Sequence, residues 1–298
     1  TLFPYTTLFR SLNYALIHGL FGLPHLGLMG IGLVTAVVAN GMALLLALHI
    51  RQHPAYAPYP IRQGLMRPSL TYLQELWRLG LPIGGTYAVE VGLFTFAAFC
   101  MGAMGSTQMA AHQIALQSVS MAFMVPVGIS YAMTMRIGQH YGAGNLLQAR
   151  LAGRVGIAFG ALIMLGFALL FWLAPYQVVS LFLDLDNPAY RDVIDLAVKL
   201  LAIAAWFELF DGTQTLAMGA IRGFKDARTT FVIGLACYWL VGAPAAWAFG
   251  FYAQGGAMGV WWGLALGLAC AALALTVAFE RKTSRLLRQA PVLASVMS

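Results

Sequence analysis

Seven runs of about 20 or more mostly apolar residues constrain the fold of this chain more than any other feature. A helix needs about that length to cross the hydrocarbon core of a bilayer, and in lipid the backbone polar groups are satisfied only in helices or closed barrels. The sequence therefore predicts an all-α, polytopic helical membrane protein. The predicted spans are Leu28–Ile50, Trp77–Met101, Ala111–Ile137, Ala152–Leu173, Val193–Ala220, Thr229–Gly250 and Gly256–Glu280, preceded by a partial helix at Leu12–Leu20.

The charge content excludes a soluble globular protein. Only 9% of the residues are charged, against about 25% in soluble domains. The 17 Lys and Arg outnumber the 10 Asp and Glu, but they lie in short loops between apolar runs, so nucleic-acid binding is not predicted. The three cysteines lie inside apolar runs without a CxxC pair, which indicates neither disulfides nor a zinc site.

The distribution of Lys and Arg predicts the orientation. Fourteen of the 17 fall in one set of loops and in the C-terminal tail, whereas the opposite loops hold only Arg191 and Lys199. Cytoplasmic loops carry such an excess. We therefore expect a multi-pass protein with a cytoplasmic C-terminus.

The chain is expected to have five parts. Residues 1–11 resemble translated sequencing-adapter read-through, so the natural N-terminus is expected to be missing. Residues 12–50 would be the remnant of one lobe, 51–76 a proline-rich cytoplasmic linker, 77–280 a complete six-helix lobe and 281–298 a cytoplasmic tail. A short repeat supports two similar lobes, because Asn13-Tyr-Ala-Leu-Ile and Cys237-Tyr-Trp-Leu-Val each precede a Gly-x-Met-Gly motif, which ends at Gly30 and Gly259 respectively.

Three acids lie well inside apolar runs, namely Glu90, Glu208 and Asp211. Each costs about 2.5–3.5 kcal/mol at a helix centre, so such residues face the bundle interior or a water-filled cavity. No Lys or Arg lies at a similar depth in the sequence. Glu90 and Asp211 are therefore candidate proton- or cation-exchanging groups, although both could instead be protonated residues that join helices by hydrogen bonds. Thr215, four residues after Asp211, lies on the same helix face.

Other motifs have simpler interpretations. Gly259, Gly263 and Gly267 form a small-residue stripe that predicts close helix packing. His112 could carry protons, but a structural role is the simpler reading. No Walker A motif is present, so this chain contains no ATP-driven motor.

Four motifs resemble the MATE (multidrug and toxic compound extrusion) family, in its bacterial NorM-like branch. They are Leu81-Pro82 with Glu90, then Met109-Ala-Ala-His112-Gln113, then Arg136-Ile-Gly138 through Gly142-Ala-Gly144, and Asp211-Gly-Thr-Gln214 running into Gly219-Ala-Ile-Arg222-Gly223-Phe-Lys225-Asp226. Their order fits over about residues 12–280.

The resemblance implies a twelve-helix transporter with two six-helix lobes, of which this chain would hold the end of helix 5, helix 6 and the whole C-terminal lobe. It implies that Glu90 and Asp211, in helices 7 and 10, form the C-lobe cation or proton site. Phe207, Glu208, Gln113 and Thr215 would be its neighbours. Some relatives carry Tyr where Phe207 stands, so an oxygen ligand for Na⁺ is absent at that position.

The implied activity is export of amphipathic organic cations across the bacterial inner membrane, driven by Na⁺ or H⁺ antiport. No cofactor beyond the coupling ion, no metal beyond Na⁺ at Glu90 and Asp211, no enzymatic activity and no nucleic-acid partner are expected. Membrane lipid and drugs are the partners, and the full-length protein would be a monomer.

Two alternatives remain open. A lipid-linked oligosaccharide flippase of the same superfamily would need a cationic cavity, whereas the deep charges here are acidic. An intramembrane prenyltransferase would need paired acidic metal-binding motifs; Asp184-x-Asp186 and Asp192-x-x-Asp195 come closest, but they lie on the predicted outer side.

Overall fold

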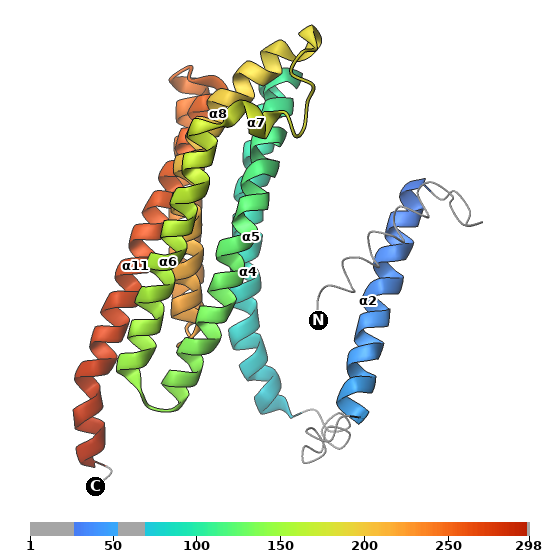
Figure 1. Cartoon of the computed structure of the whole chain (residues 1–298). Helices are drawn as coiled ribbons and strands as arrows, with labels where there is room; N and C mark the ends of the chain where they lie inside the picture. The colour runs from blue at the N-terminus through green and yellow to red at the C-terminus, as the bar shows by residue number, and fades with distance from the viewer. Residues whose placement is uncertain (1–26, 53–68, 297–298) are drawn as a thin grey trace. The chain divides into compact units, whose positions relative to one another are not determined.

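The computed structural model describes residues 27–52 and 69–296, and it is helical throughout these ranges, with short turns between helices (Figure 1). The chain divides into two units, Thr1–Tyr72 and Leu73–Ser298. In the first unit α2 (Gly27–Gln52) confirms the helix predicted over Leu28–Ile50. The predicted partial helix Leu12–Leu20, with the first half of the repeat, lies outside the described residues.

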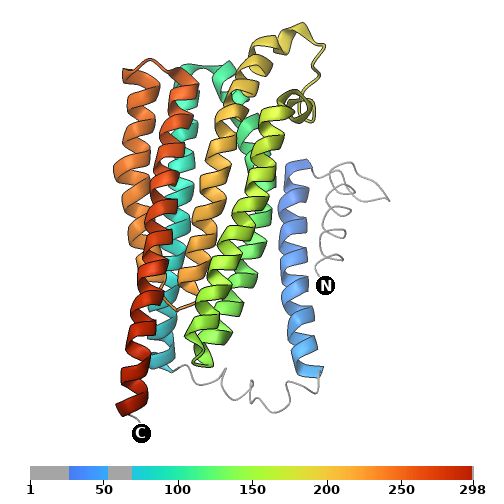
Figure 2. The same ribbon diagram turned by 60° about the vertical axis from the view of Figure 1, so that its left-hand side comes forward.

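The second unit is a bundle of long helices that run side by side (Figures 1 and 2). Each predicted span corresponds to a helical stretch that is somewhat longer than predicted. The elements are α4 (Leu70–Met104), α5 (Ser106–Gly142), α6 (Leu146–Leu173), α7 (Pro175–Val179), η3 (Pro188–Tyr190), α8 (Arg191–Arg222), α9 (Ala227–Ala236), η4 (Cys237–Gly242), α10 (Ala243–Trp247), η5 (Ala248–Tyr252) and α11 (Gly256–Val296).

The turns between helices use residues suited to them. Gly105 joins α4 to α5 with φ of 133°, and Gly144 follows α5 with φ of 75°, a region that disfavours other residues. Asn145 then caps α6, because its side chain accepts a hydrogen bond from the backbone N–H of Gln148. Asp226 caps α9 in the same way through Thr229. Local residues thus mark where these helices begin and end.

Helix α8 occupies the centre of the bundle, where it packs against α5, α6 and α11. Six other helical stretches among the described residues are long and apolar enough to cross a membrane, whereas α8 is equally long but more polar. Its deep polar residues, Glu208, Asp211 and Gln214, are buried by the surrounding helices. The central position therefore explains how a helix with this composition is accommodated at membrane depth.

The stretch from Ala227 to Tyr252 is one continuous helical path that widens twice into π-helix, at η4 and η5. Pro244, two residues after the end of η4, has no N–H to donate to the preceding turn, which favours a local change in hydrogen-bond register. The glycine stripe of α11 packs closely against this path, because a Cβ on Gly267 would lie 2.6 Å from the Cα of Gly242. The packing role predicted for the stripe is confirmed.

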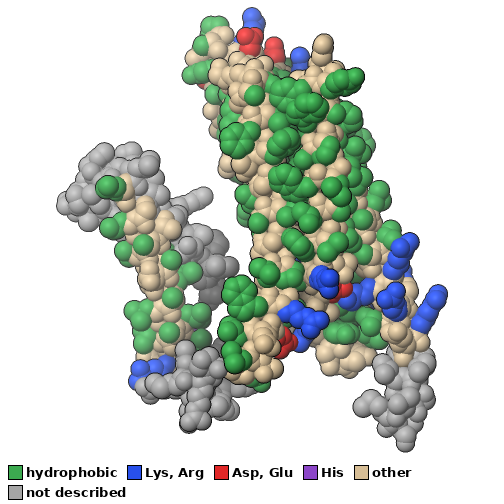
Figure 3. Space-filling view, turned by 180° about the vertical axis from the view of Figure 1, so that it is seen from behind, with side chains coloured by type: hydrophobic (Ala, Val, Ile, Leu, Met, Phe, Trp, Pro, Cys, Tyr) green, Lys and Arg blue, Asp and Glu red, His purple; other side chains and the backbone are tan. Residues whose placement is uncertain are grey.

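Ion pairs join helices at the end of the bundle that holds the α5–α6 and α8–α9 turns, which we term the basic end. Arg154 on α6 donates to Glu280 on α11 over 2.7 Å, and Arg150 binds the same carboxylate. Lys282 on α11 binds Asp226 over 2.6 Å. In Figure 3 hydrophobic side chains cover most of the length of the bundle, and Lys and Arg gather toward its lower end.

Candidate functional site

A cavity of about 320 Å³ lies between α4, α5 and α8, and it contains two of the three acids predicted to lie at membrane depth. Glu90 enters it from α4 and is half-buried, whereas Asp211 enters from α8 and is only 2% exposed. The remaining lining residues are apolar or small hydroxyl side chains, namely Val91, Phe94, Thr95, Ala98, Leu116, Val119, Ser120 and Phe123. The structure thus brings together two carboxyls that are 121 residues apart in the sequence, 211 minus 90.

Asp211 is held by a hydrogen-bond chain that the sequence did not reveal. The side-chain amide of Gln214 donates to Oδ1 of Asp211 over 2.9 Å. The hydroxyl of Tyr238, on η4, donates in turn to the amide oxygen of Gln214 over 2.6 Å. Gln214 and Tyr238 are both completely buried. Gln214 ends the Asp211-Gly-Thr-Gln214 motif, so its proximity to Asp211 has a local signal, but nothing local to Tyr238 indicates which helix it faces.

Glu90 and Asp211 form no salt bridge with any described residue, since the ion pairs of the described bundle join Arg150, Arg154 and Lys282 to other acids. One cation nevertheless acts on Glu90 electrostatically, and this is Arg222 at the end of α8. Its guanidinium lies 5.4 Å from the centre of the Tyr87 ring, one turn before Glu90 on α4. The sequence places Arg222 in a loop and does not indicate that its side chain extends to Tyr87 on α4.

Glu208 and His112 are buried titratable side chains that lie outside the cavity. Glu208 is fully buried, and neither carboxyl oxygen has a hydrogen-bond partner in the part of the chain that the structure describes. His112 is equally buried, with both ring nitrogens unpartnered on the same basis. Its ring packs edge-on against Trp261 with centroids 5.7 Å apart. Both residues are thus enclosed by the lobe rather than exposed to the cavity.

The other predicted site neighbours do not line the cavity. Phe207 is buried and packs against Phe94, a lining residue, and against Trp261. Gln113 lies on an exposed position of α5. Thr215 accepts a hydrogen bond through its backbone carbonyl from Ser130 over 3.0 Å. Their part in ion or drug binding stays a prediction.

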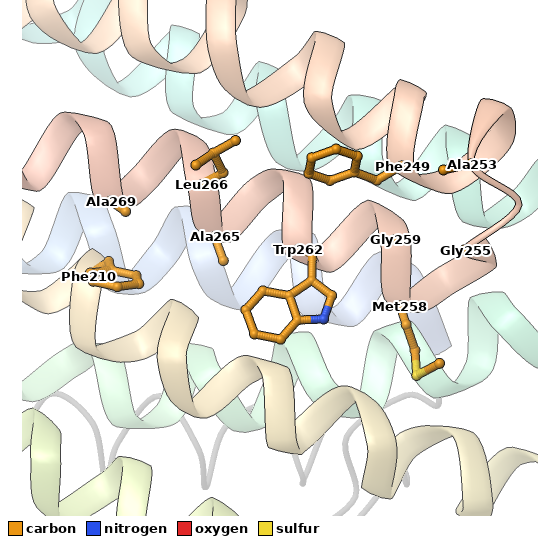
Figure 4. A pocket seen from close by; sticks show the side chains of 10 residues that line it. All are labelled: Phe210, Phe249, Ala253, Gly255, Met258, Gly259, Trp262, Ala265, Leu266 and Ala269. Atoms are coloured by element: carbon orange, nitrogen blue, oxygen red, sulfur yellow. The ribbon is translucent and has the colours of Figure 1, made fainter.

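A larger cavity of about 700 Å³ lies on another side of α8, between α8, η5 and α11. Phe210, the neighbour of Asp211 in sequence, lines it together with Phe249, Trp262 and Leu266 (Figure 4). No lining residue is charged. This pocket can accommodate apolar groups, but none of its lining side chains is a carboxyl or another group that exchanges a proton.

The small cavity can therefore bind a cation or a proton, because carboxylates are the ligands that such species prefer. It offers no Lys or Arg among its lining residues for a pyrophosphate group. No group of three or more His, Cys, Asp or Glu suited to a metal occurs within residues 27–52 and 69–296. The acids near the α7–α8 connection, Asp184 and Asp186, form a local turn, in which the Asp186 N–H donates to Asp184.

Residues 82–248 match the MatE family model, which spans the helices that carry Glu90, Asp211 and Tyr238. The chain belongs to the MatE family. The family resemblance and the all-α membrane fold predicted from the sequence are thereby confirmed.

Relatives with the name NorM match most of the chain. A probable multidrug resistance protein NorM of Pseudomonas syringae is 75% identical over 285 residues, covering 96% of this chain and 62% of the relative. The multidrug resistance protein NorM of Burkholderia vietnamiensis is 41% identical, covering 93% of this chain and 59% of that protein. The chain thus spans about three-fifths of the length of these relatives, and none of their names is that of an enzyme.

Solved structures of MATE transporters share the fold. An outward-facing multidrug resistance MATE family transporter superposes with a TM-score of 0.83 at 19% identity, covering 95% of this chain and 61% of that one. A eukaryotic MATE transporter gives a TM-score of 0.80 at 18% identity, covering 96% of this chain and 63% of that one. At such identities the likeness concerns the fold alone.

Proposed function

We propose that this chain is the larger part of a cation-coupled antiporter that exports organic cations across the bacterial inner membrane. Its C-terminus would lie in the cytoplasm, on the side of the basic end. The observation that carries the proposal is the cavity in which Glu90 and Asp211 meet without a salt bridge. The names of the NorM relatives, which refer to multidrug resistance, support drugs as the substrates.

The coupling ion would bind where the two carboxyls converge. Two carboxylates in one small cavity with a mainly apolar lining repel each other strongly, so uptake of Na⁺ or H⁺ removes an unfavourable charge. Release of the ion restores that charge. The cavity therefore has two states that differ by one positive charge, and this difference is what a coupled transporter needs to bias alternating access.

The same charge difference would act on the drug. An organic cation is attracted to an empty carboxylate site and repelled once the coupling ion occupies it. Phe94 and Phe123 offer aromatic surface beside the carboxyls for the apolar body of such a substrate. Exchange would follow from competition between the two cations and the accompanying change of conformation.

A hybrid transporter tests this proposal. This chain is joined to the part of the Pseudomonas syringae relative that it does not cover. Ethidium export is then measured in proteoliposomes with Na⁺ and pH gradients applied separately. We expect Glu90→Gln and Asp211→Asn each to lower gradient-driven export about 5- to 150-fold. This range corresponds to the loss of a typical coupling free energy between two binding sites.

Thr95→Val, which alters a cavity residue without changing its charge, is the matched control and should export nearly normally. Normal export by both acid variants would refute the site. Failure of the unmodified hybrid to export ethidium under either gradient would contradict the proposed function.

A further inference from the structure

The buried hydrogen-bond chain behind Asp211 is a feature that cation exchange alone does not require. It consists of Tyr238 and Gln214, which lie on different helices and end at one carboxyl oxygen of Asp211. Tyr238 and Gln214 are fully buried and Asp211 is nearly so. Buried polar groups are costly unless they are paired, so a chain of this kind defines one geometry.

The direction of the hydrogen bonds is fixed along the chain. The phenol of Tyr238 donates to the amide oxygen of Gln214, which leaves the amide nitrogen to donate to Oδ1 of Asp211. A reversed amide would place its N–H₂ group against the phenol and leave a carbonyl facing a carboxyl. Within the described helices no residue donates to the other oxygen, Oδ2. That oxygen is therefore free for a proton or a cation from the cavity.

The position of Tyr238 depends on the irregular helix that carries it. Tyr238 lies in the first π segment, η4, and Pro244 follows it by six residues. The segment is pressed against α11 where Gly242 meets Gly267. π segments inside helices often occur at functional sites, and one added residue per widened turn changes the direction of the side chains beyond it. The widened turn thus sets the direction from which the phenol approaches Gln214.

We infer that Gln214 and Tyr238 are positioning residues for the coupling ion, because they bind Oδ1 of Asp211, leave Oδ2 unpartnered in the acid that lines the cavity with Glu90, and connect its charge to the helix of residues 227–252. This inference rests on the proposed function. An ionised Asp211 accepts a stronger hydrogen bond from Gln214 than a protonated or cation-bound Asp211 does. A change in the charge of Asp211 therefore changes the strength of its hydrogen bond to Gln214 and, through Gln214, of the hydrogen bond to Tyr238 on the π segment. Ion binding and the shape of this helix consequently depend on each other.

The test uses Tyr238→Phe, which removes one hydroxyl and keeps the ring, and Gln214→Met, which keeps the length of the side chain. In the hybrid transporter, the concentration of the driving ion that gives half-maximal ethidium export is measured. We expect each variant to shift that concentration about 2- to 10-fold, the effect of one lost hydrogen bond. The double variant should shift it no further than the larger single change, because both residues act through one chain.

Tyr252→Phe is the matched control, since this tyrosine lies on the same helical path and is 85% exposed. It should leave the half-maximal concentration unchanged. Glu90, Glu208 and Cys237 are the other titratable groups near Asp211 and Tyr238, and they stay intact in all variants.

A merely structural role would give another result, in which the amount of folded protein or the maximal rate falls while the half-maximal ion concentration stays constant. That result, or additive shifts in the double variant, would overturn the inference. Both would leave the proposed function intact if Asp211→Asn still loses export. Normal export by both Asp211→Asn and Glu90→Gln would instead refute the proposed ion site, on which this inference rests.

Discussion

Five of the ten acids of this protein form two sets that are treated in opposite ways by their surroundings. At the basic end, Asp226 and Glu280 are each bound by Lys or Arg of another element. In the middle of the bundle, Glu90, Glu208 and Asp211 form no salt bridge with any residue in the described ranges. The first set joins helices where water and headgroups are near, and the second set is enclosed by apolar side chains.

The difference shows that charge pairing and function are separable in this fold. Paired acids join neighbouring helices, so we expect their replacement to affect stability more than transport. Unpaired acids cost stability at membrane depth, and a site that exchanges ions is a reason to retain them. Asp211 combines both demands, since Gln214 orients it through a neutral hydrogen bond that leaves its charge unneutralised.

The strongest test of the difference between paired and unpaired acids is to place a fixed cation beside Glu90 and Asp211. Ser120 lines the same cavity as Glu90 and Asp211. We expect Ser120→Lys to lower ethidium export at least about tenfold, because an ammonium group among two carboxyls attracts them by more than the roughly 1.4 kcal/mol that this factor represents. Ser120→Met, of similar length and no charge, should retain export. Equal export by the two variants would contradict an ion site in this cavity.

Glu208 tests whether an unpaired acid outside the cavity has the same role. Both of its oxygens are buried and unpartnered among the described residues. Replacement by Met removes a desolvated polar group, so Glu208→Met should raise the free energy of unfolding by about 1–3 kcal/mol. Thermal unfolding in detergent measures this change, and ethidium export should persist. Loss of export in a well-folded variant would place Glu208 in the ion pathway.

At the basic end, Glu280→Gln applies the same substitution as Glu90→Gln to a paired acid. The variant should lower the free energy of unfolding by about 1 kcal/mol, since partly exposed ion pairs contribute little. Export should stay within about twofold of normal, a change equivalent to about 0.4 kcal/mol. Denaturation and export assays on the same variant measure both quantities. Loss of export by a variant of unchanged stability would contradict this prediction.

The smallest expected effect is a pH dependence at Asp226. Burial opposes ionisation of this carboxyl, but the hydrogen bonds from Lys282 and Thr229 outweigh it and lower its pKa below the ordinary 3.8. A lowered pKa in the folded state stabilises the fold above pH 3.8, and this contribution is lost as the pH falls through the lowered value. Asp226→Asn should therefore be less stable than the parent at pH 6 by about 1 kcal/mol at most.

Below pH 3 the stabilities of this variant and its parent should converge. Melting temperatures at several pH values measure the effect. A constant difference from pH 6 to pH 3 would show that Lys282 contributes through packing rather than through the ionised carboxylate.

Much of the fold could be predicted because each long helix is encoded locally, by apolar length and by end signals such as Gly144 and Asn145. The acids of the cavity could be predicted for the same reason, since a carboxyl within an apolar run is unusual in any fold. Only the polarity of α8 indicates its central position in the bundle. Helix ends extended beyond the predicted spans, because polar end turns such as Leu70–Leu76 leave the apolar window before the helix stops.

The partners of the acids could not be predicted, because they depend on tertiary packing. Tyr238 reaches Gln214 from 24 positions away in sequence, and its direction is set by a π segment that apolar periodicity does not reveal. Arg222 belongs to a basic loop by sequence, yet its side chain extends back over Tyr87. Pro244 was the one local sign of irregularity in that helix.

The widened turn at η4 also marks where this helix can change in length. A π segment contains one residue more than a regular helix of the same rise, and each residue of an α-helix turns the chain by about 100°. Deletion of one residue within Cys237–Gly242 would therefore convert η4 into a regular α-helical turn. The segments on either side could stay near their present positions, with Gly242 or its replacement still beside Gly267, but Tyr238 would approach Gln214 from another direction. A deletion in a regular stretch of the same helix would instead rotate everything beyond it by about 100°.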